Sequence, residues 1–135
     1  MFSVLKSYEK DKNTLTIAFY NLENLFDIID DPKTFDDDFS FSGKLKWNKK
    51  RYFKKINKLT NVIKQIGIEN SFYAPVLVGV AEVENKKVLE DLVNSNDLKG
   101  LHYDYVHYNS MDDRGIDVGL LYNKQLFELL NSERF

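Results

Sequence analysis

The sequence predicts an α/β fold built on a mixed sheet, and three observations indicate it. The apolar run at 76–80, VLVGV, has the length and valine content of a buried strand. From Asn48 onward, apolar residues recur every three or four positions, the period of an amphipathic helix. Two β-rich segments, 103–108 and 116–122, are separated by a short connection typical of a hairpin. Helical crossovers combined with a hairpin predict both parallel and antiparallel strands.

The first element is predicted to be a strand over residues 14–20, TLTIAFY, which ends near Asn21. An irregular acidic stretch, DIIDDPKTFDDDF, follows it and contains a single basic residue, Lys33. The stretch lacks the spacing and central glycine of an EF-hand loop, so we do not expect it to bind calcium.

The second element is predicted to be a helix that Asn48 caps and Gly67 terminates. Its basic face contains no acidic residue. This face is either simply exposed to solvent, which is the commoner case, or binds nucleic acid. The acidic stretch before the helix could neutralise part of its positive charge. The apolar stripe consists of Tyr52, Ile56, Leu59, Ile63 and Ile66. We expect the first four of these to point inward and Lys49, Lys50, Lys54, Lys55 and Lys58 to be largely exposed.

The strand after Pro75 reads as buried on both of its faces. A short helix at 86–94 should follow, with Asn85 as its cap. The tyrosine-rich strand at 103–108 is flanked by two histidines that should face opposite sides and would make a poor metal pair. The inward residues of the short helix are predicted to be Val88, Leu89, Leu92 and Val93.

The composition is that of a globular protein. The chain has 135 residues, with 43% hydrophobic and 30% charged residues, enough for one domain or part of one. Its net charge of −2 gives no overall reason to expect a polyanionic partner. The absence of cysteine excludes disulfides and thiolate metal sites. The N-terminus lacks the apolar core of a signal peptide, and no run approaches the ~18 apolar residues of a membrane span, so we expect a cytoplasmic protein.

Polar residues follow the predicted strands at their ends. Asn21 closes the first strand, Glu82 closes the second, and Asp117 lies in the fourth, preceded by Arg114. Glu82 is either a solvated strand end or part of a site, because a buried carboxylate needs a partner or a metal. If the strands are neighbours, these oxygens converge on one edge of the sheet, and magnesium suits such a set of donors.

Four motifs, FYNLENLFD, a tryptophan followed by RY and a helix, LVGVAEVEN and DDRGIDVGLLY, together resemble the endonuclease/exonuclease/phosphatase superfamily. The resemblance runs from about Thr14 to Tyr122 and is closest to the bacterial branch of hypothetical nucleases. It implies Mg²⁺-dependent hydrolysis of phosphoesters, with Mn²⁺ as an alternative ion. Nucleic acids, phosphoinositides, sphingomyelin and small phosphates are all substrates within the superfamily. It also implies that Glu82 ligates the metal and that Asn21 is the strand-end asparagine of the site.

The resemblance implies a four-layer α/β sandwich of two sheets between helices, of which this chain supplies roughly the first half. Residues 14–135 would be a partial domain and residues 1–13 an N-terminal extension. The Gly-Asp-x-Asn and Ser-Asp-His motifs of the second half are absent, and neither His102 nor His107 matches the catalytic histidine. We therefore expect a fragment that is inactive without its missing half. The alternatives are a non-catalytic binding module that kept the sheet, or a truncation without function.

Two residues in or near the last strand, Asp117 and Arg114, each have two possible roles. Asp117 is either a further metal ligand or, slightly favoured, a structural residue paired with Arg114 or with another strand. Arg114 either contacts the phosphate of the substrate or forms an ordinary salt bridge in its loop.

Overall fold

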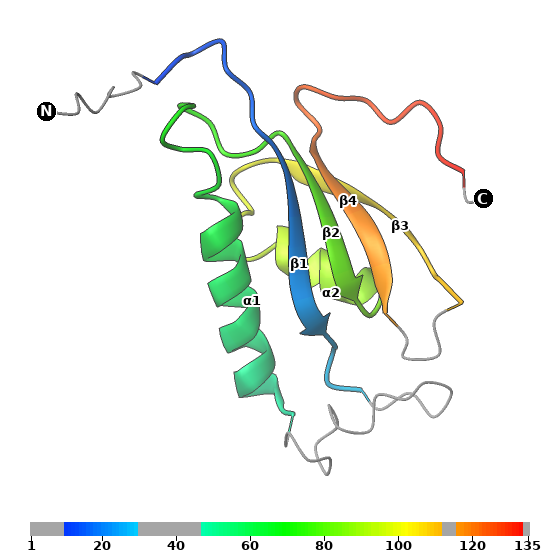
Figure 1. The fold of residues 1–135 in the computed structure, drawn as a ribbon. Helices are drawn as coiled ribbons and strands as arrows, with labels where there is room; N and C mark the ends of the chain where they lie inside the picture. Colours follow the sequence, from blue (N-terminus) through cyan, green and yellow to red (C-terminus); the bar gives the residue numbers. More distant parts are fainter. Residues whose placement is uncertain (1–9, 30–46, 112–115, 134–135) are drawn as a thin grey trace, which may run out of the picture.

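The computed structural model describes residues 10–29, 47–111 and 116–133. In this part of the chain, no helix is long and apolar enough to cross a membrane. The order of helices and strands is the order that the sequence predicts (Figure 1). The elements are β1 (Ile17–Leu25), α1 (Lys49–Ile63), β2 (Leu77–Val83), α2 (Lys86–Val93), β3 (Tyr103–Tyr108) and β4 (Asp117–Asn123).

The strands form one four-stranded sheet in the order β1-β2-β4-β3. β1 and β2 are parallel and are joined by the crossover that contains α1, whereas β4 is antiparallel to both β2 and β3. The mixed sheet predicted from the sequence is therefore confirmed. This topology brings the ends of β1 and β2 to the same edge of the sheet as the start of β4.

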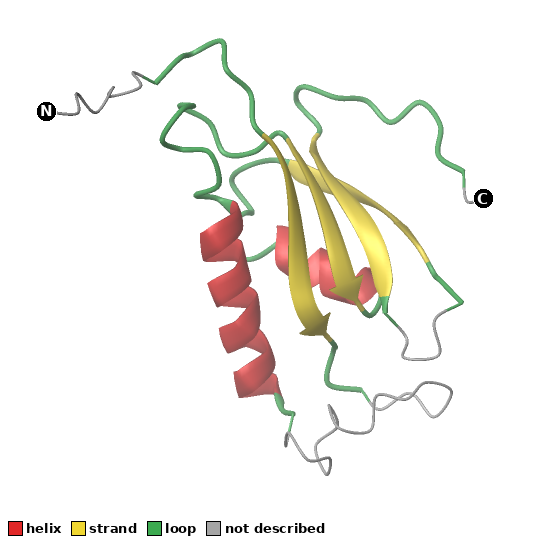
Figure 2. Cartoon of the chain, viewed as in Figure 1, coloured by secondary structure: helices red, strands yellow, loops and turns green. Residues whose placement is uncertain are grey.

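Both helices pack on the same face of the sheet, where they share one core with the inward residues of the strands. Figure 2 shows α2 behind the strands and α1 beside β1. The predicted helix phases are confirmed, since Ile56 and Ile63 of α1 and Leu89 and Leu92 of α2 are fully buried. The caps are confirmed as well: the Asn48 side chain accepts a hydrogen bond from the Arg51 amide at the start of α1.

The opposite face of the sheet, here called the open face, is apolar and exposed. Ile17 is 73% exposed, Phe19 70% and Val118 64%. A Cβ atom added to Gly79 would lie 2.7 Å from the Phe19 ring, so that ring lies across the backbone of β2. The expectation that β2 is buried on both faces is wrong: Leu77 is only half-buried, because the helices cover one face alone. The described residues thus form two layers of the expected sandwich.

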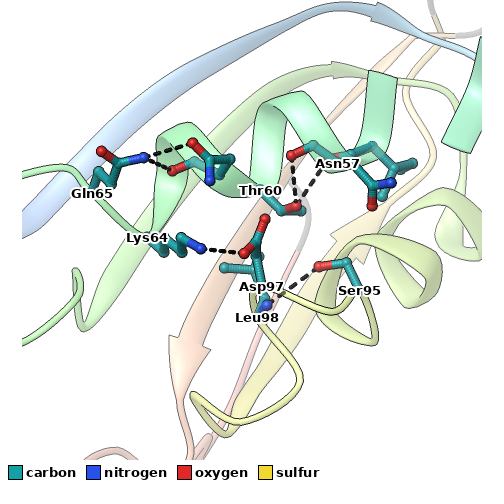
Figure 3. Close-up of polar contacts among 9 residues, drawn as sticks. Asn57, Thr60, Lys64, Gln65, Ser95, Asp97 and Leu98 are labelled. Carbon is teal, nitrogen blue, oxygen red and sulfur yellow. Dashed lines mark hydrogen bonds and ion pairs between the residues drawn. The ribbon is translucent and has the colours of Figure 1, made fainter. Parts of the chain in front are cut away.

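The end of α1 is joined to the turn after α2 by an ion pair (Figure 3). Lys64, the C-cap residue of α1, forms an ion pair with Asp97 of that turn. The turn is closed by the Leu98 amide, which donates to the Ser95 hydroxyl at 3.3 Å. α1 ends at Ile63, and Gly67, predicted as its stop, occupies the following turn with a φ of +78°. The end of α1 is therefore connected to the turn after α2 by one ion pair, in addition to the shared core.

Candidate functional site

The strand-end residues that the sequence singles out lie at the same edge of the sheet. Asn21 pairs with Ala81 and Asp117 pairs with Val83, so they flank Glu82 from the strands on either side. The convergence expected from the sequence is therefore present in the backbone. The side chains do not all lie on one face of the sheet. Because β2 is irregular at Glu82, Ala81 and Val83 point to opposite faces. Their partners differ accordingly: Asn21 is exposed and Asp117 is buried.

The backbone at this edge is strained on both β1 and β2. The ladder runs regularly to the pair Asn21–Ala81 and resumes at Leu25–Val83. Between these pairs, Glu23, Asn24 and Glu82 have φ values of 54°, 56° and 59°. The left-handed region costs a non-glycine residue on the order of 1–3 kcal/mol, and such strain tends to cluster at functional sites.

This bulge also extends β1 beyond the strand predicted at 14–20. β1 runs from Ile17 to Leu25, so Asn21 lies within the strand rather than at its end. The local sequence around Asn21 contains no glycine or proline that would signal the irregularity. The extension depends instead on pairing with β2, some 58 residues away along the chain.

The Glu82 carboxylate is half-buried and is held by the bulge. Its Oε2 accepts a hydrogen bond of 3.0 Å from the Asn24 amide. Within the described residues, its Oε1 accepts no hydrogen bond. The bulge is braced from the β1 side too, because Asn21 Oδ1 accepts a hydrogen bond of 2.7 Å from the Glu23 amide. Asn21 and Glu82 thus hold successive peptide groups of the same bulge.

A cation from α1 reaches the same bulge. Lys55 Nζ donates to the Asn24 carbonyl at 3.1 Å and also to the Glu23 carbonyl. It lies 5.8 Å from the centre of the Trp47 ring. Burial lowers the pKa of Lys55 from its ordinary value, and the negative charges of Glu23 and Glu82 oppose that shift.

The prediction that Lys55 is exposed with the other lysines of α1 is therefore wrong. Lys55 is half-buried because its ammonium group turns inward to donate hydrogen bonds to the carbonyls of the bulge. The prediction is confirmed for the other four, Lys49, Lys50, Lys54 and Lys58, which are exposed.

A second polar cluster joins the end of β1 to the start of α2. Glu84 Oε2 accepts from the Asp27 amide at 2.5 Å, and Asp27 Oδ2 accepts from Asn85 Nδ2 at 3.1 Å. Asn85 Oδ1 in turn accepts from the Val88 amide at 3.1 Å, which confirms Asn85 as the cap of α2. Sequence reasoning missed Asp27, which is buried, because it was grouped with the acidic stretch that begins at this residue.

Asp117 is paired with His107, which the sequence analysis treated as an ordinary surface or strand residue. His107 Nε2 lies 2.8 Å from Asp117 Oδ2, and both side chains are 5% exposed. The other oxygen, Oδ1, accepts from the Ser110 amide at 2.6 Å. His107 is therefore not an ordinary strand residue but joins β3 to β4. Arg114, the other proposed partner of Asp117, lies outside the described residues.

The oxygen ligands that remain available at this edge of the sheet suit a metal ion that takes few ligands from the protein. Among residues 10–29, 47–111 and 116–133, no group of three or more carboxylates and imidazoles could hold a metal ion. What remains is one oxygen of Glu82, with the amide of Asn21 on the neighbouring strand. Magnesium is commonly held by one or two carboxylates, with water and substrate phosphate as the other ligands. The residues fit that arrangement and exclude a cage made by these residues alone.

The mixed sheet with helices on one face places the chain among the α/β proteins, in which ligands commonly bind at the carboxyl ends of the strands. The model of the endonuclease/exonuclease/phosphatase family matches residues 16–135, and the chain belongs to this family. Comparison with curated proteins and with solved structures gave no match. Membership of the family supports a hydrolase of nuclease or phosphatase type, with phosphoesters or nucleic acids as substrates.

Proposed function

We propose that this protein serves metal-dependent phosphoester hydrolysis, with Glu82 as a direct ligand of Mg²⁺ or, alternatively, Mn²⁺. The observation that carries the proposal is the half-buried Glu82 carboxylate at the bulged edge, with one oxygen held by the Asn24 amide and the other available. A carboxylate in such a place is costly to desolvate unless it meets a positive charge. Lys55 supplies part of that charge, and the bound cation would supply the rest.

The residues at this edge of the sheet would have different roles in the reaction. A divalent cation bound there would polarise the phosphoryl oxygens and stabilise the leaving oxyanion. Glu82 would hold it, and Asn21, whose Oδ1 is engaged by Glu23, would offer its amide protons to a phosphate oxygen or to bound water. For Arg114 we propose a contact with the substrate phosphate, on the sequence alone.

Asp117 is assigned a structural part in this proposal. Both oxygens of Asp117 already accept a hydrogen bond in a buried setting, from His107 and from the Ser110 amide, and turning the carboxylate toward a metal would weaken one of these contacts. Breaking a buried polar pair leaves one partner unsatisfied, which costs roughly 1–3 kcal/mol. We therefore expect Asp117 to hold the β3–β4 connection at the site rather than bind the ion.

We further propose that these 135 residues alone hydrolyse phosphoesters poorly. The chain has two histidines. His107 is buried against Asp117, and His102 precedes β3 at the opposite edge of the sheet, so neither can serve as general base beside Glu82. General base catalysis contributes about 10²- to 10⁴-fold. The substrate within the phosphoester class, nucleic acid included, is left open.

Metal binding by the purified chain tests the central assignment. Isothermal titration with Mn²⁺ should detect binding in the wild type and not in Glu82→Gln, which keeps the shape of the side chain and removes its charge. The matched control is Glu69→Gln, since Glu69 is an exposed carboxylate in the turn region after α1. It should bind Mn²⁺ as the wild type does. Equal binding by all three proteins would refute the assignment of Glu82.

Turnover is the second readout, measured with Mg²⁺ on nicked DNA, linear DNA and a chromogenic phosphodiester. We expect turnover near background for the 135-residue chain. Mg²⁺-dependent turnover that Glu82→Gln abolishes would support Glu82 and contradict the proposal of low activity. Retained substrate binding without any metal dependence would favour a non-catalytic binding module.

A further inference from the structure

One peptide group at the site edge is held between a cation and an anion. The Glu23 carbonyl and the Asn24 amide belong to the same peptide unit, and its two polar atoms point in opposite directions because the unit is planar and trans. Lys55 Nζ donates to the carbonyl, and Glu82 Oε2 accepts from the amide at 3.0 Å. The peptide dipole therefore has Lys55 at its negative end and Glu82 at its positive end.

This arrangement gives Lys55 control over a residue that it does not hydrogen bond. Glu23 and Asn24 both occupy the left-handed region, which they can keep only if surrounding contacts outweigh the strain. Lys55 contributes two such contacts, one to each carbonyl, from the rigid frame of α1. Hydrogen bonds in which one partner is charged are the strongest kind available to hold a strained peptide.

We propose that Lys55 is a positioning residue that fixes the Glu82 carboxylate through the Glu23–Asn24 peptide. Its effect on metal binding rests on the proposed function, whereas its effect on the carboxylate does not. Without Lys55 the peptide is free to relax from its strained conformation, and the Asn24 amide no longer points at Glu82. The available oxygen of Glu82 then loses its defined place at the edge.

The sign of the effect separates positioning from simple electrostatics. Lys55 is close enough to Glu82 for the two charges to interact. If Lys55 acted only through its charge, removing it would relieve repulsion of a metal cation and tighten binding. If it positions Glu82, removing it should weaken binding despite that relief, because partners that orient a ligand typically matter by about 10- to 100-fold in metal affinity.

The first measurement is Mn²⁺ affinity by isothermal titration. Lys55→Met keeps the length and apolar stem of the side chain and should weaken Mn²⁺ binding by roughly tenfold or more. Lys55→Arg keeps a charged donor for the carbonyls and should recover part of the loss. The matched control, Lys58→Met, removes an exposed lysine one turn further along α1 and should leave the affinity unchanged. Tighter binding by Lys55→Met would overturn the proposal.

The second measurement needs no metal. The amide proton of Asn24, followed by ¹H–¹⁵N NMR, reports its hydrogen bond to the carboxylate. Lys55→Met and Glu82→Gln should shift this resonance in the same direction, and Lys58→Met should not. An unchanged resonance in Lys55→Met would also overturn the proposal. If the wild type bound no Mn²⁺, the proposed function would fail while this resonance still decided the role of Lys55. Should Lys55→Met not fold, Lys55→Gln takes its place in both measurements, because it is shorter and uncharged and should therefore give the same weakening and the same shift.

Discussion

At the scale of single residues, burial gives Tyr103 a measurable effect on stability at high pH. Its hydroxyl donates to the Pro75 carbonyl, and burial raises the pKa of Tyr103 from 10.0 to about 12. Between pH 10 and pH 12 the tyrosine is more ionised in the unfolded chain than in the folded one. The stability that this group provides is therefore fully present below pH 10 and is lost as the pH rises toward 12.

Tyr103→Phe should flatten this alkaline loss of stability. At pH 8 the variant should be less stable than the wild type by about 1 kcal/mol, the usual net value of one hydrogen bond. Between pH 10 and pH 11 most of this difference should disappear, because linkage over that interval is worth about 1 kcal/mol, somewhat less than the ~1.4 kcal/mol of one full pKa unit. Urea unfolding at pH 8, 10 and 11 measures both. Parallel pH curves for the two proteins would show that Tyr103 does not cause the loss.

At the scale of elements, α2 depends on Asn85 for two interactions. The side chain caps the helix through the Val88 amide and donates to Asp27 at the end of β1. Asn85→Ala removes both and should cost about 1–2 kcal/mol of unfolding free energy. Asn85→Ser keeps a capping oxygen but cannot reproduce the amide donor, so its loss should be intermediate.

Urea unfolding of the Asn85 variants has a matched control in Asn96→Ala, at an exposed position in the turn after α2. This control should stay within about 0.5 kcal/mol of the wild type, as surface substitutions usually do. Equal stability of Asn85→Ala and Asn85→Ser would mean that the cap contributes nothing and that only the contact with Asp27 matters.

At the scale of the whole molecule, the open face is the dominant surface feature. Ile17, Phe19, Val118 and Leu120 come from two different strands and all remain at least 40% exposed. Contiguous apolar patches of this kind usually mark an interaction surface or an aggregation hazard. The purified chain should therefore bind the dye ANS and associate with itself as its concentration rises.

The double variant Ile17→Thr/Val118→Thr should weaken both behaviours. Threonine keeps the β-branched shape suited to a strand and replaces apolar surface with a hydroxyl. Sedimentation velocity over a range of concentrations should show a smaller shift to large species than in the wild type, and ANS fluorescence should fall. Self-association as strong in the double variant as in the wild type would show that the open face is not the surface responsible.

Much of the fold could be predicted because it depends on near neighbours in the chain. The stripe Tyr52–Ile56–Leu59–Ile63 follows from helical periodicity, and the caps Asn48 and Asn85 follow from side chains that reach amides three residues ahead. The polar residues at strand ends were visible for the same reason. Their metal and catalytic roles stay predictions.

By itself, the sequence determined the elements, their order, the mixed sheet and the residues at its carboxyl edge. Tertiary structure alone decided the bulge at Glu23 and Asn24, the burial of Lys55 and the pairing of His107 with Asp117. Helix phase and capping involve residues within a turn of each other, which a local pattern can encode. The bulge instead depends on Glu82 and Lys55, 58 and 31 residues from Asn24 along the chain, and becomes favourable only when β1, β2 and α1 meet.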